Sequence, residues 1–161
     1  MMHRTFISLA ASDVRGTRDT ELYGQLSGKL SFAVEPAQRA AWNYQIDHLR
    51  DLAQHFPSAY FAMEFLIPRM GRRADLIILL SGLVFVIEYK VGSGSFDRSS
   101  LNQTYDYGLD LKHFHEPSHD RRIIPILVVT KAAGGQVADV DWDEDGLARA
   151  VSVNADEVAP R

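Results

Sequence analysis

Three short apolar runs follow one another in the middle of the chain, and the turns between them constrain the fold more than any other feature. We expect strands near 59–67, 73–80 and 83–91, because each run is short and apolar. Ser81-Gly82 separates the last two runs by two residues, which is the spacing of a tight β-hairpin. A second reversal is expected within 68–71, a segment that contains both Pro and Gly. The sequence therefore predicts three antiparallel strands in sequential order.

Each run carries one acidic residue, and the two turns place these acids side by side. With Ser81-Gly82 at the hairpin turn, Asp75 lies opposite Glu88. With the earlier reversal centred on residues 69–70, Glu64 lies opposite Asp75. Directly opposed residues have Cβ atoms roughly 5 Å apart. We therefore expect a row of three carboxylates across the strands, an all-oxygen ligand set within reach of one or two divalent cations.

Lys90 follows Glu88 by two residues and is therefore expected on the same strand face. An Asp, a Glu-x-Lys and a further Glu are suited to metal-assisted phosphodiester hydrolysis. The competing interpretation is a solvated face closed by cross-strand ion pairs. Ile77 and Val86, on the expected faces of Asp75 and Glu88, argue against it, because carboxylates beside apolar side chains need a partner or a metal ion.

Composition fits one globular domain spanning 1–161. At 161 residues and 46% hydrophobic content the chain can bury a core. A formal net charge of -4 argues against binding nucleic acid by overall charge, so a local basic patch would be needed. The absence of cysteine excludes disulfides, thiolate metal sites and thiol catalysis. The first apolar stretch is too short for a signal peptide or a membrane span, so we expect a cytoplasmic protein without a membrane partner.

Two helices and a further strand complete the expected core. Apolar residues recur at helical spacing from Pro36 until Pro57 ends the run. A second helix is expected from Asp97, its candidate N-cap, to about His115. The run 123–130 is nearly all apolar, which is typical of a buried strand. This order predicts an α/β fold in which helices flank a central mixed sheet.

The remaining segments are expected to extend this core, which we place at 36–131. The N-terminal extension, 1–34, contains a candidate helix at 19–26. The C-terminal extension, 132–161, contains a candidate strand at 148–153 and no evident closing element. We therefore expect a domain taken from a longer chain.

Several of these features resemble one known group of enzymes. The order of elements, Asp75, the triplet Glu88-Tyr89-Lys90 and the helix that follows resemble the PD-(D/E)XK nuclease superfamily. Gln103 and Tyr107, four residues apart on one helical face, resemble the Q-x3-Y motif of its RecB-type branch.

Longer segments extend the resemblance to about residues 30–155. Residues 72–92, 95–120 and 123–132 look like the N-terminal nuclease-like region that precedes an ATPase in bacterial helicase-like proteins of the Schlafen-type ATPase group. The resemblance implies a restriction-endonuclease-like three-layer core, with an antiparallel three-strand meander plus a fourth strand. It also implies a helicase-like ATPase domain as partner, in DNA repair or phage defence.

The resemblance implies roles for the carboxylates of this row and for the residues next to them. Asp75 and Glu88 would bind Mg²⁺ or Mn²⁺ together with the backbone carbonyl of Tyr89. Lys90 would orient or help to deprotonate the attacking water and steady the charge on the phosphate. Ala74 stands where the motif has proline, which is not a ligand.

The additional acid of the site stays open at this point. Strand pairing favours Glu64 as a secondary catalytic residue and metal ligand. The family usually draws this acid from the first helix, where Glu35 and Asp47 are the alternatives.

Nucleic acid is the expected partner, with DNA preferred and RNA open. By the resemblance, Gln103 and Tyr107 would position DNA or the active-site lysine. Arg72, Arg73 and Arg98 are the expected phosphate contacts because they lie at turns or strand and helix ends. Other basic residues in similar positions are Arg69, Arg121, Arg122 and Lys131.

Two further sequence patterns are weak evidence for a functional site. His113, His115 and His119 suggest zinc, but i, i+2 spacing on a helix diverges. Gly92-x-Gly94 lacks the Gly-Lys-Ser/Thr of a phosphate loop, so this domain supplies no ATPase.

Three functions compete: a metal-dependent nuclease domain, a catalytically silent nuclease fold that binds nucleic acid, and a protein-interaction or dimerisation module. The intact acidic row beside Lys90 favours the first. The oligomeric state stays open.

Overall fold

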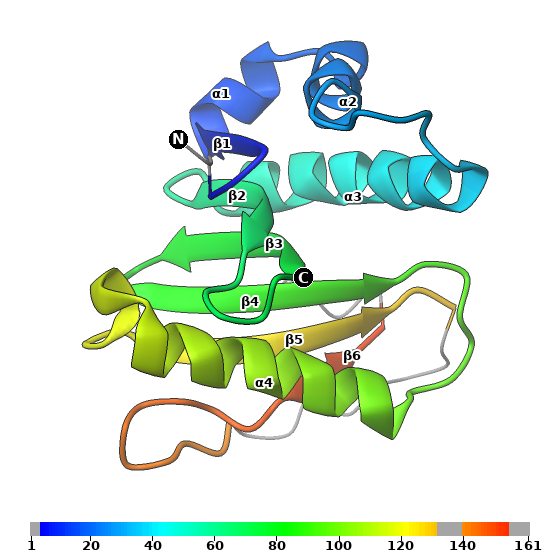
Figure 1. Ribbon diagram of the computed structural model, residues 1–161. Coiled ribbons are helices and arrows are strands. Elements are labelled where there is room, and N and C mark those ends of the chain that lie inside the picture. Colours follow the sequence, from blue (N-terminus) through cyan, green and yellow to red (C-terminus); the bar gives the residue numbers. More distant parts are fainter. Residues whose placement is uncertain (1–3, 132–139, 155–161) are drawn as a thin grey trace.

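A mixed six-stranded β-sheet forms the centre of the protein (Figure 1). The computed structural model describes residues 4–131 and 140–154. In sheet order the strands are β1 (Ile7–Ala10), β2 (Tyr60–Leu66), β3 (Arg73–Leu80), β4 (Leu83–Lys90), β5 (Arg122–Val129) and β6 (Val151–Val153). The strands β1 to β4 pair antiparallel, whereas β5 is parallel to β4 and β6 is parallel to β5. The predicted α/β class is confirmed.

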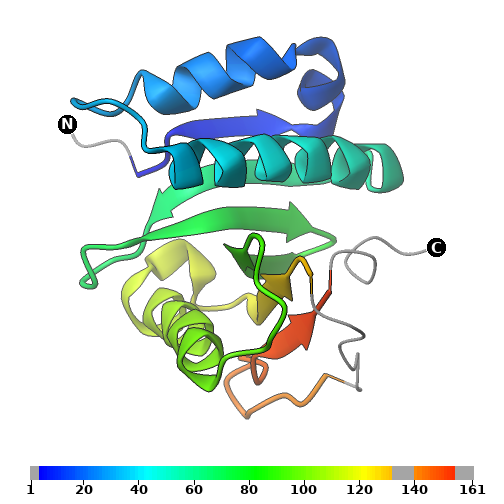
Figure 2. The ribbon, with the colours of Figure 1, turned by 90° about the vertical axis from the view of Figure 1, so that its right-hand side faces the viewer.

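Helices lie on both faces of this sheet. They are α1 (Ala11–Gly16), α2 (Asp19–Ser27), α3 (Pro36–His55) and α4 (Arg98–Phe114), followed by a short 3₁₀ helix (Glu116–Ser118). Figure 2 shows α1, α2 and α3 on one side and α4 on the other. Because β5 is parallel to β4, the chain must cross between the two strands, and α4 is that connection. No helix in the described ranges is long and apolar enough to cross a membrane.

The residues predicted to start the two long helices occupy the expected positions. Pro36 occupies the first turn of α3, where its missing N–H costs nothing. Asp97 caps α4: its Oδ1 accepts a hydrogen bond from the Ser99 amide at 2.9 Å, and its Oδ2 accepts one from the Ser100 hydroxyl at 3.0 Å.

Two apolar cores stabilise the sheet, one on each face. The core on the α3 side contains Trp42, Ile46, Leu49, Phe61, Met63, Leu76, Ile78 and Ile87. The core on the α4 side contains Ala74, Ile77, Val84, Val86, Tyr107, Leu111 and Ile123. Strands of this sheet are therefore apolar on both faces, which is why they appear as nearly continuous apolar runs in the sequence.

The register of the three predicted strands is confirmed. Ser81 and Gly82 both have positive φ, 52° and 79°, as a two-residue type I′ hairpin requires. Leu76 then pairs with Ile87. Across the earlier turn, Leu76 pairs with Met63, which is the predicted alignment.

The sheet is wider than the sequence indicated. The N-terminal segment contributes β1, which pairs with β2, and α1, neither of which was predicted. A four-residue edge strand has too few alternating positions to be recognised without its partner. The helix expected at 19–26 is α2, and the strand expected at 148–153 is shorter, at Val151–Val153. The rest of the predicted C-terminal extension, 132–139 and 155–161, lies outside the described residues.

Gly108 allows α4 to pack closely on β5, and this contact yields a prediction. A Cβ at residue 108 would lie 2.9 Å from Pro125 Cγ and 3.0 Å from Leu147 Cδ1. Gly108→Ala should therefore destabilise the protein by about 1–3 kcal/mol in urea unfolding, because the proline ring cannot move aside. Gly24→Ala is the matched control: a Cβ there meets nothing within 4 Å, so the variant should gain about 0.5–1 kcal/mol. Equal effects of the two substitutions would contradict the close packing.

Candidate active site

The backbone pairing between β3 and β4 stops before either strand ends. Its last pair is Leu76 with Ile87. Beyond that point β3 continues along β2 to Arg73, while β4 continues along β5 to Lys90. The sheet therefore forks between its two central strands, and the predicted acids lie at this fork.

Two carboxylates bridge the fork. Glu88 Oε1 accepts a hydrogen bond from the Asp75 amide at 2.9 Å, and Asp75 Oδ2 accepts one from the Tyr89 amide at 2.9 Å. Each side chain thus takes the place of a backbone carbonyl as acceptor, which satisfies an amide that the interrupted pairing would leave without a partner. This leaves Asp75 and Glu88 side by side, as predicted, and both side chains are half-buried.

Glu64 leaves the expected common face. Its φ is 55°, an unusual value for a non-glycine residue, and it breaks the two-residue alternation of β2. As a result Ala62 and Phe65 both pack on the α4 side. The Glu64 carboxylate instead accepts a hydrogen bond at 3.0 Å from Nε1 of Trp42, on α3. The register that places Glu64 opposite Asp75 holds, but the assumption of one shared face was wrong because the strand is not regular at this residue.

Arg73 holds this irregular segment together. Its Nη1 donates to the Glu64 carbonyl at 2.7 Å and to the Arg4 carbonyl at 3.1 Å. Its guanidinium also lies over the Phe6 ring, 4.5 Å from the centroid. The structure therefore gives Arg73 a structural role, and its contact with nucleic acid stays a prediction.

Burial raises the pKa of all three acids, and neighbouring negative charge adds to the rise in Asp75 and Glu88. Burial is the main cause of the rise in the pKa of Asp75 to about 7, and the charge of Glu64 adds to it. Burial, and then the charge of Asp75, raise the pKa of Glu88 well above its usual range. Burial also raises the pKa of Glu64, although the Trp42 hydrogen bond opposes it. Such shifts at a shared site are typical of functional carboxylates.

Lys90 lies near this negative charge but remains exposed. Its charge lowers the pKa of both Asp75 and Glu88. Within the described part of the chain it forms no ion pair with either. The amine is therefore free to act on a bound molecule rather than locked to a carboxylate.

The oxygen atoms of the fork fit a hard divalent cation. One oxygen each of Asp75, Glu88 and Glu64 is engaged by an N–H donor, and the second oxygen of each accepts no hydrogen bond among the described residues. Carboxylate oxygens are hard ligands, which suit Mg²⁺ or Mn²⁺ better than the nitrogen and sulfur ligands typical of zinc sites. Residues 4–131 and 140–154 contain no group of three or more His, Cys, Asp or Glu side chains that could hold a metal ion together. Glu35 and Asp47, the alternatives on the first long helix, are exposed.

The predicted Gln-Tyr pair lies beside the fork. Gln103 Nε2 donates to the Tyr107 hydroxyl at 2.5 Å, and the nearby Arg72 lowers the pKa of that hydroxyl. Burial raises the pKa of Tyr107, and the charge of Glu88 contributes to the rise. An open, polar groove runs past this pair, lined by Met70, Arg72, Arg98, Ser99, Asn102, Gln103 and Asp106.

The other basic candidates are arranged differently. The Arg69 guanidinium lies over the Phe114 ring, 4.3 Å from the centroid. Arg122 pairs with Leu83, at the opposite end of β4 from Lys90. Arg72 and Arg98 are therefore the predicted phosphate contacts that the structure brings to the groove.

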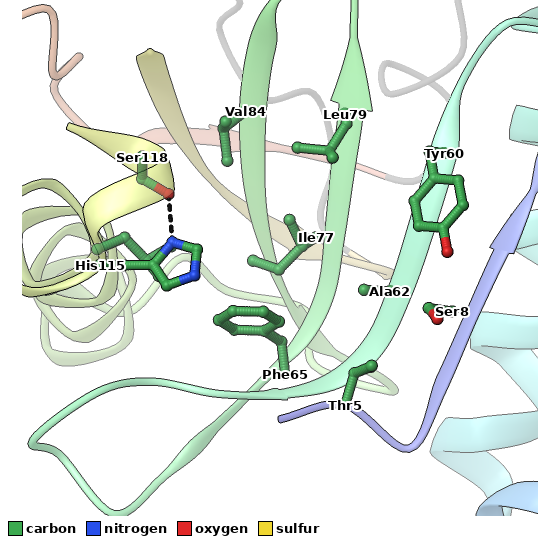
Figure 3. A pocket seen from close by; sticks show the side chains of 11 residues that line it. Thr5, Ser8, Tyr60, Ala62, Phe65, Ile77, Leu79, Val84, His115 and Ser118 are labelled. Carbon is green, nitrogen blue, oxygen red and sulfur yellow. Dashed lines mark hydrogen bonds between the residues drawn. The ribbon is translucent and has the colours of Figure 1, made fainter. Parts of the chain in front are cut away.

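A separate apolar cavity of about 230 Å³ lies on the α4 side of the sheet (Figure 3). Phe65, Ile77 and Val84 line it, together with His115, whose Nδ1 lies 2.7 Å from the Ser118 hydroxyl. Its lining includes no Asp, Glu, Lys or Arg, so it lacks the groups for phosphodiester chemistry.

The three histidines near the end of α4 form no shared site. His115 faces that cavity, while His119 Nε2 lies 3.2 Å from the His113 carbonyl. They do not converge on a common ligand position within the part of the chain that the structure describes.

Sequence reasoning missed two residues that contact the row. Trp42 bonds Glu64, and His48 Nδ1 lies 2.7 Å from the Tyr89 hydroxyl. Both come from the buried face of α3. A histidine at a core position of an amphipathic helix was the one available signal.

No protein-family model, curated protein or solved structure matches the chain. Its function is therefore argued from the chemistry of the fork and the groove.

The raised pKa of Asp75 predicts how stability depends on pH. The folded protein takes up this proton near pH 7, whereas the unfolded chain takes it up only near 3.8. In a buffer with chelator, this group therefore adds stability as pH falls below about 7. Asp75→Asn keeps the acceptor for the Tyr89 amide but removes the charge. It should melt a few degrees above wild type near pH 8, and this advantage should shrink towards pH 5.

Asp47→Asn, an exposed change of the same charge on α3, is the control and should show neither effect. A difference between Asp75→Asn and wild type that stays constant with pH would contradict the electrostatic account.

Proposed function

We propose that this chain is a Mg²⁺- or Mn²⁺-dependent nuclease domain of the PD-(D/E)XK type, with a restriction-endonuclease-like core, that hydrolyses phosphodiester bonds in DNA. The observation that carries the proposal is the fork between β3 and β4. There Asp75 and Glu88 interlock through backbone amides, with a free Lys90 beside them. Two adjacent carboxylates with raised pKa values are costly to the fold unless a cation balances their charge.

In this proposal Asp75, Glu88 and the Tyr89 carbonyl would hold the ion, and Glu64 would contribute from the α3 side. A bound ion of this class lowers the pKa of a coordinated water and neutralises charge on the phosphate. Lys90 orients the attacking water and stabilises the charge that develops on the phosphate oxygens. The raised pKa of Asp75 means that protons compete with the metal below about pH 7.

The groove along α4 is the proposed path of the nucleic acid. Arg72 and Arg98 supply positive charge in an otherwise acidic protein, and Gln103 supplies an amide donor. Gln103 lines this groove and donates to Tyr107, and the charge of Glu88 acts on Tyr107, which supports a substrate path close to the row. We further propose that a helicase-like ATPase domain in the same longer protein delivers the strand.

A catalytically silent fold is the second candidate, and one observation favours it. The Glu64 carboxylate is held by Trp42, which leaves two carboxylates rather than three at the fork. Such a protein would bind nucleic acid in the same groove without cleaving it. Cleavage by the wild-type protein in Mn²⁺ separates the two candidates.

Lys90→Ala tests the chemistry apart from folding. Because Lys90 is exposed and forms no ion pair with the acids in the described structure, the variant should fold and melt near wild type. Cleavage of labelled DNA in Mn²⁺ should fall roughly a hundredfold to ten-thousandfold. Lys29→Ala removes the same charge from an exposed position between α2 and α3 and should cleave normally. Full activity of Lys90→Ala would refute the role assigned to this lysine.

Arg98→Ala tests the groove. If Arg98 contacts a phosphate, the variant should bind DNA more weakly whatever the base sequence, and the slope of log affinity against log salt should fall by about 1. Arg18→Ala removes an exposed arginine next to α2 and should leave both quantities unchanged. Equal slopes for Arg98→Ala and wild type would place the nucleic acid elsewhere.

A further inference from the structure

Three polar or amphipathic side chains form a buried stripe on the sheet-facing side of α3. Trp42, Gln45 and His48 are spaced three residues apart, which places them on one helical face. Their exposed fractions are 1%, 2% and 6%. This stripe interrupts an otherwise apolar core, so its polar atoms need an explanation.

The two ends of the stripe contact residues of the candidate active site. Trp42 Nε1 donates to Glu64 Oε1 at 3.0 Å. His48 Nδ1 and the Tyr89 hydroxyl lie 2.7 Å apart, and the two rings meet edge to face with centroids 5.5 Å apart. Tyr89 belongs to β4 and stands between Glu88 and Lys90 in the chain.

Tyr89 is thereby held at two points. Its hydroxyl is tied to α3 through His48, and its amide donates to Asp75 Oδ2 at 2.9 Å. The main chain at Tyr89 cannot shift without breaking one of these bonds. The position of the Asp75 carboxylate therefore depends on a contact made on the opposite face of the sheet from α4.

The His48–Tyr89 contact costs stability as well as providing it. Burial lowers the pKa of His48 to about 4, so the ring is neutral near pH 7. His48 Nε2 and Gln45 Oε1 are buried and have no hydrogen-bond partner within the described structure. Each such atom carries a desolvation penalty that an apolar side chain would avoid. A contact kept at this cost points to a role beyond packing.

We propose that His48 is a positioning residue for the candidate active site. By fixing the Tyr89 hydroxyl on α3, it fixes the main chain of β4 at the fork, and with it the Asp75 carboxylate and the Tyr89 carbonyl. Trp42 does the same for Glu64 at the other end of the stripe. The inference rests on the proposed function only where it assumes that these oxygens bind a metal ion.

The test compares metal binding with stability in four variants. Tyr89→Phe removes one hydroxyl and keeps the ring, His48→Leu removes the other partner, and the double variant removes both. His48→Gln restores a side chain that can hydrogen-bond the hydroxyl. Ile46→Val is the control, because it thins the core on the same helix without touching the stripe. Each protein is measured by Mn²⁺ calorimetry, thermal melting and amide hydrogen exchange without metal.

Tyr89→Phe and His48→Leu should each weaken Mn²⁺ binding roughly 10-fold to 100-fold, the usual range for a residue that orients a ligand. The double variant should bind Mn²⁺ no more weakly than the weaker-binding single variant, because the two substitutions remove the same hydrogen bond. His48→Gln should recover part of the affinity. In the metal-free protein the amide of residue 89 should exchange faster in both single variants. Ile46→Val should melt lower with unchanged affinity and exchange at residue 89.

Variants that melt lower yet bind Mn²⁺ like wild type, with unchanged exchange at residue 89, would show that His48 is only a core residue. A wild type that binds no Mn²⁺ would instead overturn the metal part of the proposed function. In that case amide exchange at residue 89 in the metal-free protein decides the role of His48. Faster exchange in His48→Leu than in Ile46→Val would still support positioning. Equal exchange in the two variants would overturn it.

Discussion

Two hydrogen bonds join β3 to β4 where their backbone pairing ends: the Asp75 amide donates to Glu88, and the Tyr89 amide donates to Asp75. This exchange keeps the fork closed while drawing two carboxylates out of water. Burial then raises the pKa of both acids, and the charge of Glu64 adds to the rise in each. The arrangement is unfavourable by itself, and the two apolar cores that cover the sheet provide the stability that offsets it. A divalent cation would relieve the same repulsion, which links this local strain to the proposed chemistry.

The two faces of the sheet contribute to the fork in different ways. On one face, α3 contacts the site through Trp42 and His48. On the other face, α4 carries Gln103 and Tyr107, Gln103 lines the open groove, and the charge of Glu88 acts on Tyr107. The residues proposed for positioning and those proposed for substrate binding thus come from helices on opposite faces of the sheet. Substitutions on α3 and α4 should therefore affect different measurable quantities, metal affinity in the first case and nucleic-acid affinity in the second.

Local signals in the sequence were sufficient for the register of the central strands. Ser81-Gly82 determines a two-residue turn, and every pair across it follows from that turn. The kink at Glu64 could not be predicted in this way, because its positive φ depends on Trp42, 22 residues away, and on Arg73. The His48–Tyr89 contact joins residues 41 apart and leaves no periodic signal in either element. The fold of the central strands was therefore accessible from sequence, whereas the direction of Glu64 and the support from α3 depended on tertiary contacts.

The most direct test of the central claim is a crystal of the protein soaked in Mn²⁺ and measured at a wavelength where manganese scatters anomalously. The account predicts an anomalous peak at the fork, roughly 2.0–2.3 Å from oxygens of Asp75 and Glu88 and from the Tyr89 carbonyl. Both carboxylates should keep their bonds to the backbone amides. A peak elsewhere, or none at the fork under saturating Mn²⁺, would show that the two acids form a structural pair and would contradict the account.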